Sequence, residues 1–513
     1  MKIIKADEAA AMFQSGWTVI MEGFLGSGSA DALGRAVEQR FLATGEPRDL
    51  TLIFCAGQGD REHRGVNRFG HVGLTRIVIG SHFGPIPMMR DLIEKNEVEA
   101  HNWPQGVVAH LYRAIAGGRP GVVTKIGLHT FVDPRYEGAC MNARAEKSLI
   151  ELVTLRGEEY LFYPSMPINC ALIRGTTADE NGNITTEHEA IHVDHLAIAQ
   201  AAHNSGGMVI VQVKRLTKAG TMNPNTVRIP GILVDYVVLS DPRDHWMTYV
   251  EEHNPAYTGE VREPDHAFTP PPLDIEKVIG RRAFMELLPL QRPVVNLGAG
   301  MPTIVGNVAR EEGRTDFVFT VEAGPIGGTP APDLSFGAAI NPEAIVDQAA
   351  QFDFYDGGGL DIAFLGLAEL DHLGNVNASR FGDRRPGIGG FINITQATKR
   401  LVFMGTFTAG NPEVIVKDGC LQILKEGKVK KIVREVTQLS FNGPYAAKMG
   451  AKILYVTERA VFTIKDGRLT LIEIAPGINL QKDILDQATT EIVVAADLKS
   501  MDPRIFQERP MHS

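Results

Sequence analysis

Short apolar runs rich in Val, Ile and Leu alternate along the chain with longer stretches whose apolar residues recur at helical spacing, one of them at 344–348. The runs that predict buried strands span residues 18–21, 170–176, 208–213, 293–297, 317–321, 362–367 and 401–404. This alternation predicts an α/β protein with open, mainly parallel sheets covered by helices on both faces. In such sheets ligands bind beyond the carboxyl ends of the strands, so the residues that end each run are the ones to consider.

The two halves of the chain repeat each other's pattern. Near the start of each half a strand-like run leads into a Gly-x-Gly turn, at 26–28 and at 298–300. Later, each half carries a strand-like run, an acidic turn and a Gly-Asn pair, at 182–183 and 374–375. The order of these features predicts two related domains. A proline-rich segment at 262–274 predicts a linker between a first domain at 1–261 and a second at 275–513.

Length and composition limit the classes of protein to which the chain can belong. A length of 513 residues exceeds what one core usually serves, in agreement with two domains. The net charge of -10 argues against a nucleic-acid partner, because no basic excess neutralises phosphates. The four cysteines show no metal-like spacing and are typical of small buried residues in a reducing compartment. No signal peptide and no run of about twenty apolar residues is evident, so we expect a cytoplasmic protein away from membranes.

One carboxylate stands where an open α/β fold would present a nucleophile. Glu322 directly follows the run 317–321 and precedes a segment at 323–328 that is too rich in glycine for a helix. Further glycine clusters at 357–359 and 387–390 adjoin strand-like runs, and such turns can direct backbone N–H groups at a ligand oxygen. Alternatively, Glu322 caps the next element and each cluster is only a tight turn. Three clusters in one half favour a site.

A series of motifs runs through both halves. In the second half they are GAGMP at 298–302, EAGPIGG at 322–328, FDFYDGGGLD at 352–361, GLAELD at 366–371, GNVN at 374–377, SRFG at 379–382, GGFINITQ at 389–396, GTFTAG at 405–410 and EIAPGI at 473–478. In the first half they are QG at 105–106, TFVDPR at 130–135 and LIRGTTAD at 172–179. Together they resemble the family I CoA-transferases, specifically the single-chain bacterial acetate and propionate CoA-transferases. The sequence differs from the family pattern at EGACMN, 137–142, where relatives carry more glycine. This difference bears on the shape of the acyl pocket.

The resemblance implies the CoA-transferase fold and the transfer of CoA between acyl-CoA and small carboxylic acids, without a metal or other cofactor. It implies that Glu322 is the nucleophile and carries CoA as a glutamyl-CoA thioester. It implies that the side-chain amide of Gln105 and the backbone N–H of Gly389 donate hydrogen bonds to the developing oxyanion, with Gly390 as the neighbour of Gly389. The residues expected to line the CoA channel are Gly298, Ala299, Gly300, Met301, Pro302 and Gly390. We also expect a homo-oligomer.

Other interpretations compete with this one. Residues 188–192, His-Glu-Ala-Ile-His, match a zinc motif that needs a helix and a third ligand, for which His195 is a candidate. The segment follows a turn where the other half has a loop, which favours a solvated loop without metal. Gly298 to Gly300 would suit a nicotinamide dehydrogenase, but Thr303 replaces the third glycine of that fingerprint. A thioesterase on the same scaffold and a non-catalytic CoA-binding protein are the remaining alternatives, and an intact Glu322 argues against the latter.

The sequence offers little that would hold a second carboxylate on the acyl group. Arg135 and Arg174 are candidates through their proximity to matched motifs, and we expect both to be solvated at the surface instead. Small monocarboxylic acids are therefore the expected substrates.

Overall fold

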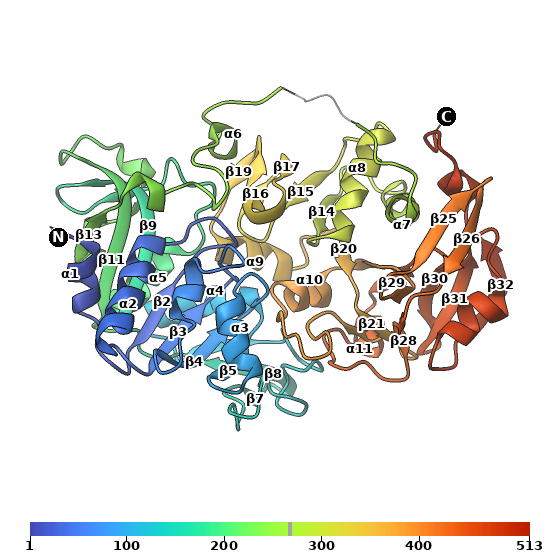
Figure 1. Cartoon of the computed structure of the whole chain (residues 1–513), viewed down its shortest axis with the longest axis horizontal. Coiled ribbons are helices and arrows are strands. Elements are labelled where there is room, and N and C mark those ends of the chain that lie inside the picture. The colour runs from blue at the N-terminus through green and yellow to red at the C-terminus, as the bar shows by residue number, and fades with distance from the viewer. Residues whose placement is uncertain (265–268, 513) are drawn as a thin grey trace. The chain divides into compact units, whose positions relative to one another are not determined.

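A computed structural model describes residues 1–264 and 269–512 and shows two compact units (Figure 1). Unit 1 comprises Met1–Pro264, Val321–Asp353 and Gly382–Asn393, and unit 2 comprises Asp265–Thr320, Phe354–Phe381 and Ile394–Ser513. The predicted boundaries at 261 and 275 stay a prediction. Residues 265–268 of the predicted linker lie outside the described residues.

Unit 1 is built on a parallel sheet. Its strands follow the order β1 (Lys2–Ile4), β13 (Tyr236–Leu239), β11 (Met208–Thr217), β9 (Cys170–Asp179), β2 (Thr18–Met21), β3 (Leu50–Phe54), β4 (Thr75–Gly80) and β5 (Glu99–Asn102), each parallel to the next. Shorter antiparallel pairings involve β10 (Ile184–Thr185) with β9 and β12 (Val227–Ile229), β8 (Glu158–Pro164) with β6 (Gly121–Thr124) and β7 (Glu151–Leu155), β16 (Pro325–Ile326) with β19 (Ala344–Ile345), and β17 (Thr329–Pro330) with β18 (Ala339–Ile340). Its helices are α1 (Ala6–Ala11), α2 (Asp31–Thr44), α3 (Pro87–Glu94), α4 (Gln105–Ala116), α5 (His195–Asn204) and α6 (Pro255–Thr258).

Helices cover both faces of this sheet, as the sequence predicts. Successive side chains of a strand point to opposite faces. On β3, Ile53 joins the apolar cluster that contains α4 and α5, whereas Leu52 and Phe54 join the one that contains α1, α2 and α3. All five residues of β3 are buried, and four of them are apolar, because the strand is covered on both faces.

Unit 2 has a second sheet with five parallel strands, followed by two antiparallel pairings and a last parallel strand. The order is β15 (Val318–Thr320), β14 (Val294–Leu297), β20 (Ile362–Gly366), β23 (Arg400–Met404) and β29 (Lys452–Val456), all parallel, then β30 (Ala460–Lys465), β31 (Arg468–Ile474) and β32 (Val493–Ser500). Apolar residues of α7 (Ile275–Phe284) and α8 (Ile304–Glu311) pack on this sheet. The smaller elements are β21 (Glu369–Asp371), β22 (Val376–Asn377), β24 (Thr408–Ala409), β25 (Glu413–Lys417), β26 (Cys420–Lys425), β27 (Val429–Lys430), β28 (Ile432–Val433) and α11 (Gly443–Lys448). Two helices, α9 (Gln348–Asp356) and α10 (Phe391–Ala397), begin in unit 1 and end in unit 2.

The same arrangement of strands recurs in the two units. The order β11-β9-β2-β3 of unit 1 matches β23-β20-β14-β15 of unit 2. The acidic turns match as well: Oδ1 of Asp179 accepts the N–H of Asn183 at 2.9 Å, and Oδ1 of Asp371 accepts the N–H of Asn375 at 3.0 Å. In both turns the asparagine side chain donates to the other carboxylate oxygen at 2.9 Å. The internal repeat seen in the sequence is therefore present in the strand order and in individual hydrogen bonds.

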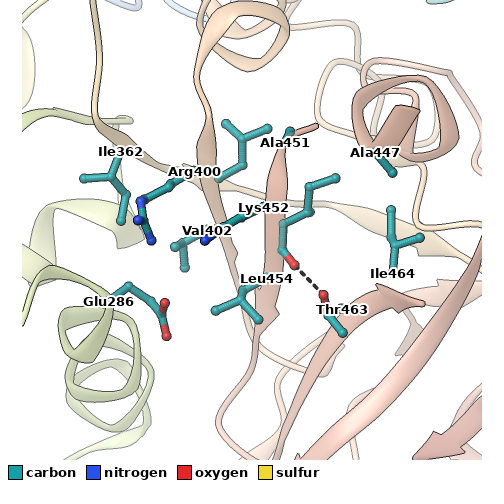
Figure 2. A pocket seen from close by; sticks show the side chains of 12 residues that line it. Glu286, Ile362, Arg400, Val402, Ala447, Ala451, Lys452, Leu454, Thr463 and Ile464 are labelled. Atoms are coloured by element: carbon teal, nitrogen blue, oxygen red, sulfur yellow. Dashed lines mark hydrogen bonds between the residues drawn. The ribbon is translucent and has the colours of Figure 1, made fainter. Parts of the chain in front are cut away.

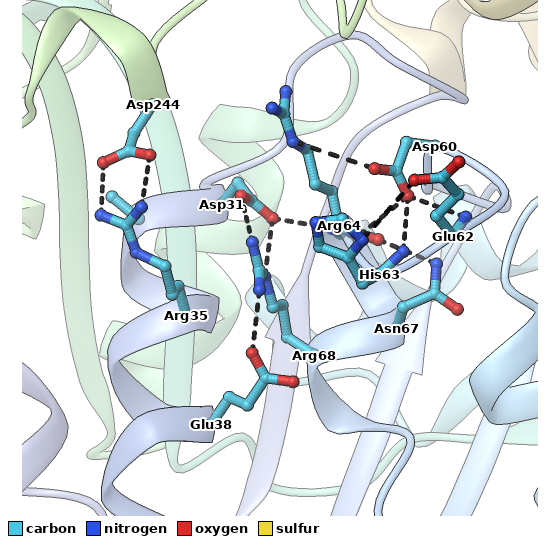
Figure 3. Close-up of polar contacts among 12 residues, drawn as sticks. Asp31, Arg35, Glu38, Asp60, Glu62, His63, Arg64, Asn67, Arg68 and Asp244 are labelled. Carbon is cyan, nitrogen blue, oxygen red and sulfur yellow. Dashed lines mark hydrogen bonds and ion pairs between the residues drawn. The ribbon is translucent and has the colours of Figure 1, made fainter.

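An ion network fixes the loop that follows β3 in unit 1 (Figure 3). Asp31, the first residue of α2, accepts the N–H of Gly65 at 2.7 Å and pairs with Arg68 at 3.2 Å. The Arg68 guanidinium also pairs with Glu38 at 2.9 Å. The charges are largely buried and compensate one another, so the network holds this loop against α2.

Two elements differ from the sequence prediction. The strand predicted at 317–321 is β15, Val318–Thr320, so that Glu322 lies in a turn two residues beyond its end. The stretch 344–348, predicted as helix, forms β19 before α9 begins at Gln348. The cause is pairing with β16, because the N–H of Val346 donates to the carbonyl of Gly324 at 3.1 Å. No helix within the described ranges is long and apolar enough to cross a membrane.

Candidate active site

Glu322 occupies a tight turn of unit 1 and is half-buried. The N–H of Gly324 donates to the carbonyl of Val321 at 3.0 Å, and the N–H of Val321 donates to the carbonyl of Pro325 at 3.0 Å. Gly324 has a φ of +121°, and a Cβ there would lie 2.0 Å from the carbonyl oxygen of Val346. Only glycine fits this position, which explains the glycine two residues after Glu322 and fixes the direction of the turn.

Gly390 lies against the Glu322 side chain, and its neighbour Gly389 lies near Gln105. A Cβ added to Gly390 would lie 3.2 Å from Cγ of Glu322. The carbonyl of Gly389 accepts the N–H of Gln105 at 3.0 Å, so unit 1 brings Glu322, Gln105 and both glycines together. The N–H of Gly389 donates to the carbonyl of Ser81 at 2.9 Å. Its role as an oxyanion donor stays a prediction and requires that bond to be exchanged.

A chain of hydrogen bonds orients the buried side-chain amide of Gln105. Its Nε2 donates to Oε1 of Gln348 at 3.2 Å. Nε2 of Gln348 in turn donates to Oδ2 of Asp194 at 3.0 Å, and the other oxygen of Asp194 accepts the N–H of Ala349 at 3.0 Å. An amide nitrogen carries two N–H groups, so Gln105 keeps a second donor beyond the one given to Gln348.

Gln348 and Asp194 are the functional candidates that the sequence analysis missed. Each stands at the start of a helix, Gln348 opening α9 and Asp194 preceding α5. Such positions are common for polar residues that cap helices, and no motif or spacing links either residue to Gln105. Their relation depends on segments more than 80 residues apart coming together, which a single sequence does not reveal.

Burial changes the protonation of the acids behind Gln105. It raises the pKa of Asp194 to about 7, although the hydrogen bonds from Ala349 and Gln348 act in the opposite direction. Burial, and after it the charge of Asp194, raises the pKa of Glu22 well above its ordinary value. One donor atom each of Glu22, Cys55 and Asp194 lies within 4.8 Å of the other two. Two buried acids this close do not both ionise readily, so the cluster holds a proton near neutral pH.

The predicted CoA loop, Gly298 to Pro302, lies in unit 2 at the carboxyl end of β14. The N–H of Gly298 donates to the carbonyl of Phe364 at 2.8 Å. Gly300, with a φ of +80°, turns the chain into a short helical turn and then α8, and Ala299 and Gly300 are exposed. A loop between a parallel strand and the next helix is a usual ligand-binding position. That these residues line a CoA channel stays a prediction.

Unit 2 also holds a cavity of about 410 Å³ (Figure 2). Ile362, Arg400 and Lys452 line it at the amino ends of β20, β23 and β29, and Glu286 contributes from the segment after α7. Since these strands run parallel to β14, the cavity lies at the opposite edge of the sheet from Gly298. None of the predicted site residues lines it.

The His-Glu-x-x-His segment forms a loop between β10 and α5 and not the helix that a zinc motif requires. The loop is as predicted, but it is not solvated throughout, because Glu189 is buried and pairs with Arg174 at 2.8 Å. Burial alone would raise the pKa of Glu189, but the charge of Arg174, together with its hydrogen bond and the contacts of His245, outweighs burial and lowers the pKa to about 2. Nδ1 of His192 lies 3.2 Å from Oγ1 of Thr186.

Both arginines that could have held a second substrate carboxylate form ion pairs within the protein. Arg174 was expected at the surface, but it is 3% exposed because Glu189 compensates its charge inside unit 1. Arg135 is exposed as expected and pairs with Asp133 at 2.7 Å and Glu159 at 2.8 Å.

Comparison with known proteins identifies the family. Residues 3–240 match the model of the Coenzyme A transferase family. The chain is 47% identical over 515 residues to caffeate CoA-transferase of Acetobacterium woodii, covering 99% of this chain and 98% of that protein. It is 41% identical over 512 residues to acetate CoA-transferase YdiF of Escherichia coli K12, covering 99% and 96%.

Solved structures agree. The apoenzyme of acyl-CoA transferase YdiF from Escherichia coli O157:H7 matches with a TM-score of 0.94 at 41% identity, covering 100% of this chain and 97% of that one. The thioester complex of YdiF with CoA matches with a TM-score of 0.92 at 40% identity, with the same coverage. The chain belongs to the CoA-transferase family, and it is an enzyme that transfers CoA. The fold class and family predicted from the sequence are confirmed.

Proposed function

We propose that this CoA-transferase exchanges CoA between short-chain acyl-CoA and free carboxylates of the acetate and propionate type, through a thioester on Glu322. The observation that carries the proposal is the turn that holds Glu322 against Gly390, in the same cluster as Gln105. A relative named for acetate and a thioester complex of YdiF with CoA support it.

The reaction needs only the carboxylate and its two substrates. An oxygen of Glu322 attacks the acyl-CoA carbonyl, the C–S bond breaks, and an acyl-glutamyl anhydride and CoA thiolate form. The thiolate then attacks the glutamyl carbonyl, the donor acid leaves as a carboxylate, and CoA remains on Glu322 as a thioester. A second carboxylate reverses both steps. One thioester replaces another, so the proposal includes no ATP, metal or other cofactor.

Each step passes through a tetrahedral oxyanion that requires hydrogen-bond donors. The second N–H of the Gln105 amide is one candidate. Gly389 is the predicted backbone donor, but its neighbour Gly390 is better placed, because its N–H makes no hydrogen bond to the described residues. An ordinary ionised glutamate is a weak nucleophile. Binding of the remote parts of CoA must therefore supply much of the acceleration, by desolvating and aligning the reacting carbonyl.

The test is to incubate the enzyme with acyl-CoA in the absence of an acceptor acid. The intact mass should rise by one CoA less one water, and borohydride should trap the adduct at Glu322. Adding acetate should release acetyl-CoA, whereas release of free CoA at a rate independent of acetate would identify a thioesterase. Glu322→Ala should lose the adduct and turnover, and near-normal turnover of this variant would refute the assignment. EDTA should leave transfer unchanged.

The setting of the enzyme is part of the same proposal: a homo-oligomer that works in the cytoplasm. All four cysteines are free, which suits a reducing compartment. Light scattering after gel filtration measures the mass in solution, and cell fractionation the location. A monomer, or recovery outside the cytoplasm, would contradict it.

A further inference from the structure

Two imidazoles and a carboxylate converge on one place in unit 1. His188 lies in the loop after β10, whereas His253 and Glu260 lie just before and just after α6. Nε2 of His253 lies 3.1 Å from Oε2 of Glu260, and Nε2 of His188 lies 3.5 Å from Oε1 of Glu260. The two ring centroids are 4.6 Å apart. One donor atom of each residue lies within 4.8 Å of the other two.

We propose that His188, His253 and Glu260 bind a divalent transition-metal ion, with water completing its coordination. A tetrahedral ion with ligand bonds of 2.0–2.1 Å holds its ligand atoms about 3.4 Å apart. The separations of 3.1 and 3.5 Å, each to a different oxygen of Glu260, bracket this value. Two imidazoles and a carboxylate suit Zn²⁺, Co²⁺, Ni²⁺ or Cu²⁺ and not Mg²⁺ or Ca²⁺. The side chains are 21%, 28% and 40% exposed, so an ion and its water can reach them.

The charges around the site also suit a cation. Glu260 is an acid, and Arg215, a cation near His188, is paired with Glu187 at 2.7 Å, which compensates its charge. Nδ1 of His188 and of His253 is buried and has no hydrogen-bond partner among the described residues.

Two other groups of potential ligands occur in the described part of the chain, and neither fits as well. In the loop after β3, Oδ1 of Asp60 already accepts three backbone N–H groups at 2.8–3.0 Å (Figure 3). In the buried cluster behind Gln105, burial raises the pKa of the Cys55 thiol and of the Glu22 carboxyl. The deprotonated forms that bind metal are therefore disfavoured there.

An ion at this site would join parts of unit 1 that are far apart in sequence. His188 belongs to the loop before α5, and the other two ligands belong to the last part of the first segment of unit 1, which ends at Pro264. Because the unfolded chain does not bring these ligands together, bound metal stabilises the folded state. None of the three residues belongs to the proposed transfer machinery, so we assign the ion a stabilising role. This inference does not depend on the function proposed for Glu322.

The experiment uses the full chain without an affinity tag, stripped with EDTA, dialysed and titrated with Co²⁺ or Zn²⁺. We expect one equivalent to bind in the micromolar range, Co²⁺ to give the visible absorption of a low-coordinate site, Zn²⁺ to abolish that absorption, and the Tm to rise. His188→Ala and His253→Ala should each weaken binding at least tenfold. Glu260→Gln keeps the shape of the side chain and should also weaken it.

His192→Ala is the matched control, because its imidazole belongs to the same sequence motif but lies outside the cluster. It should bind Co²⁺ like the wild type. Far-UV circular dichroism and the Tm of metal-free variants separate lost binding from failed folding. Absence of stoichiometric binding by the wild type, unchanged binding by both His188→Ala and His253→Ala, or equal loss in His192→Ala would overturn the proposal. A fall in transfer activity on stripping the metal would overturn the stabilising role.

Discussion

At Gly390 the absence of a side chain determines how closely the backbone approaches the proposed nucleophile. A Cβ would lie 3.2 Å from both Cγ of Glu322 and Cζ of Phe352, closer than an ordinary contact. Both neighbours would have to move by a few tenths of an ångström. Small displacements of reacting groups have large effects on rate, because the attacking atom must be aligned with the carbonyl.

We therefore expect Gly390→Ala to lower kcat at least tenfold while the Tm changes little. Gly366→Ala is the control, because a Cβ at Gly366 would meet nothing within 4 Å. Steady-state kinetics and thermal denaturation of the two variants provide the comparison. A Gly390→Ala enzyme with the kcat of Gly366→Ala would show that this glycine is not needed for the approach to Glu322.

Asp194 should make stability depend on pH. Its pKa is about 7 in the folded protein, above about 3.9 in an unfolded chain, because burial disfavours the charged form. Between these values the folded state holds a proton that the unfolded state has released, so the free energy of unfolding falls as pH rises from about 4 to about 7. Asp194→Asn cannot ionise and should lose this part of the slope, on the order of a few kcal/mol.

Thermal denaturation from pH 4 to pH 8 measures this difference. Asp497→Asn, which changes a carboxylate that is 73% exposed, should keep the slope of the wild type. Parallel curves for the wild type and Asp194→Asn would mean that the proton is held elsewhere, for example on Glu22. The same variant should also loosen Gln348 and thereby Gln105, since an asparagine supplies one acceptor oxygen in place of two.

At the scale of the elements, the acidic turns that recur in the two units are held by the same hydrogen bonds. Asp179 is 3% exposed and Asp371 is 2% exposed, and each carboxylate accepts two backbone N–H groups and one asparagine amide. Removal of the carboxylate leaves these buried donors without an acceptor, which costs more than a hydrogen bond contributes on average.

We expect Asp179→Ala and Asp371→Ala each to lower the free energy of unfolding by about 2–4 kcal/mol. The exposed Asp497→Ala should change it by less than about 0.5 kcal/mol. Urea denaturation gives the three values if the transitions are analysed for each unit separately. A loss at only one of the two turns would mean that the repeated hydrogen bonds do not have the same function.

The long elements of this fold were predictable and the short ones were not. Strands such as β9 and β20 are buried on both faces, which produces the apolar runs at 170–173 and 362–365 of the sequence. By contrast, β16 and β19 have two residues each and exist because two segments about 20 residues apart meet, so the sequence predicted helix at 344–348. Glu322 was found through its place after a strand and before glycines, whereas its chemical role came from family resemblance.

At the scale of the whole molecule, equivalent strands of the repeat are followed by residues with different roles. β3 and β15 occupy the same place in the order of their units. The residue after β3 is Cys55, a buried thiol whose pKa burial raises, and the turn after β15 carries the half-buried Glu322. Open α/β sheets bind ligands at such strand ends. The repeated order thus has a buried thiol after one strand, and after its counterpart the turn with the proposed nucleophile, which belongs to unit 1.

The range of carboxylic acids that the enzyme accepts depends on whether an arginine is free to pair with a second carboxylate. Arg174 is buried with Glu189, and Arg135 is held by Asp133 and Glu159, so neither is available to a second carboxylate on the substrate. Succinate and glutarate would have to lose water from that carboxylate without gaining a partner. An apolar pocket discriminates by only about 1–3 kcal/mol per methylene, so neighbouring chain lengths should react at graded rates.

We therefore expect kcat/KM for acetate and propionate to exceed that for succinate at least tenfold, with butyrate in between. The measurement uses the four acids as acceptors against one common acyl-CoA donor, at constant ionic strength. Glu322→Ala serves as the blank, because any CoA transfer that it shows does not pass through the proposed thioester. Succinate reacting ten times faster than acetate would reveal a cation that meets the second carboxylate, and the inference from the two paired arginines would then be wrong.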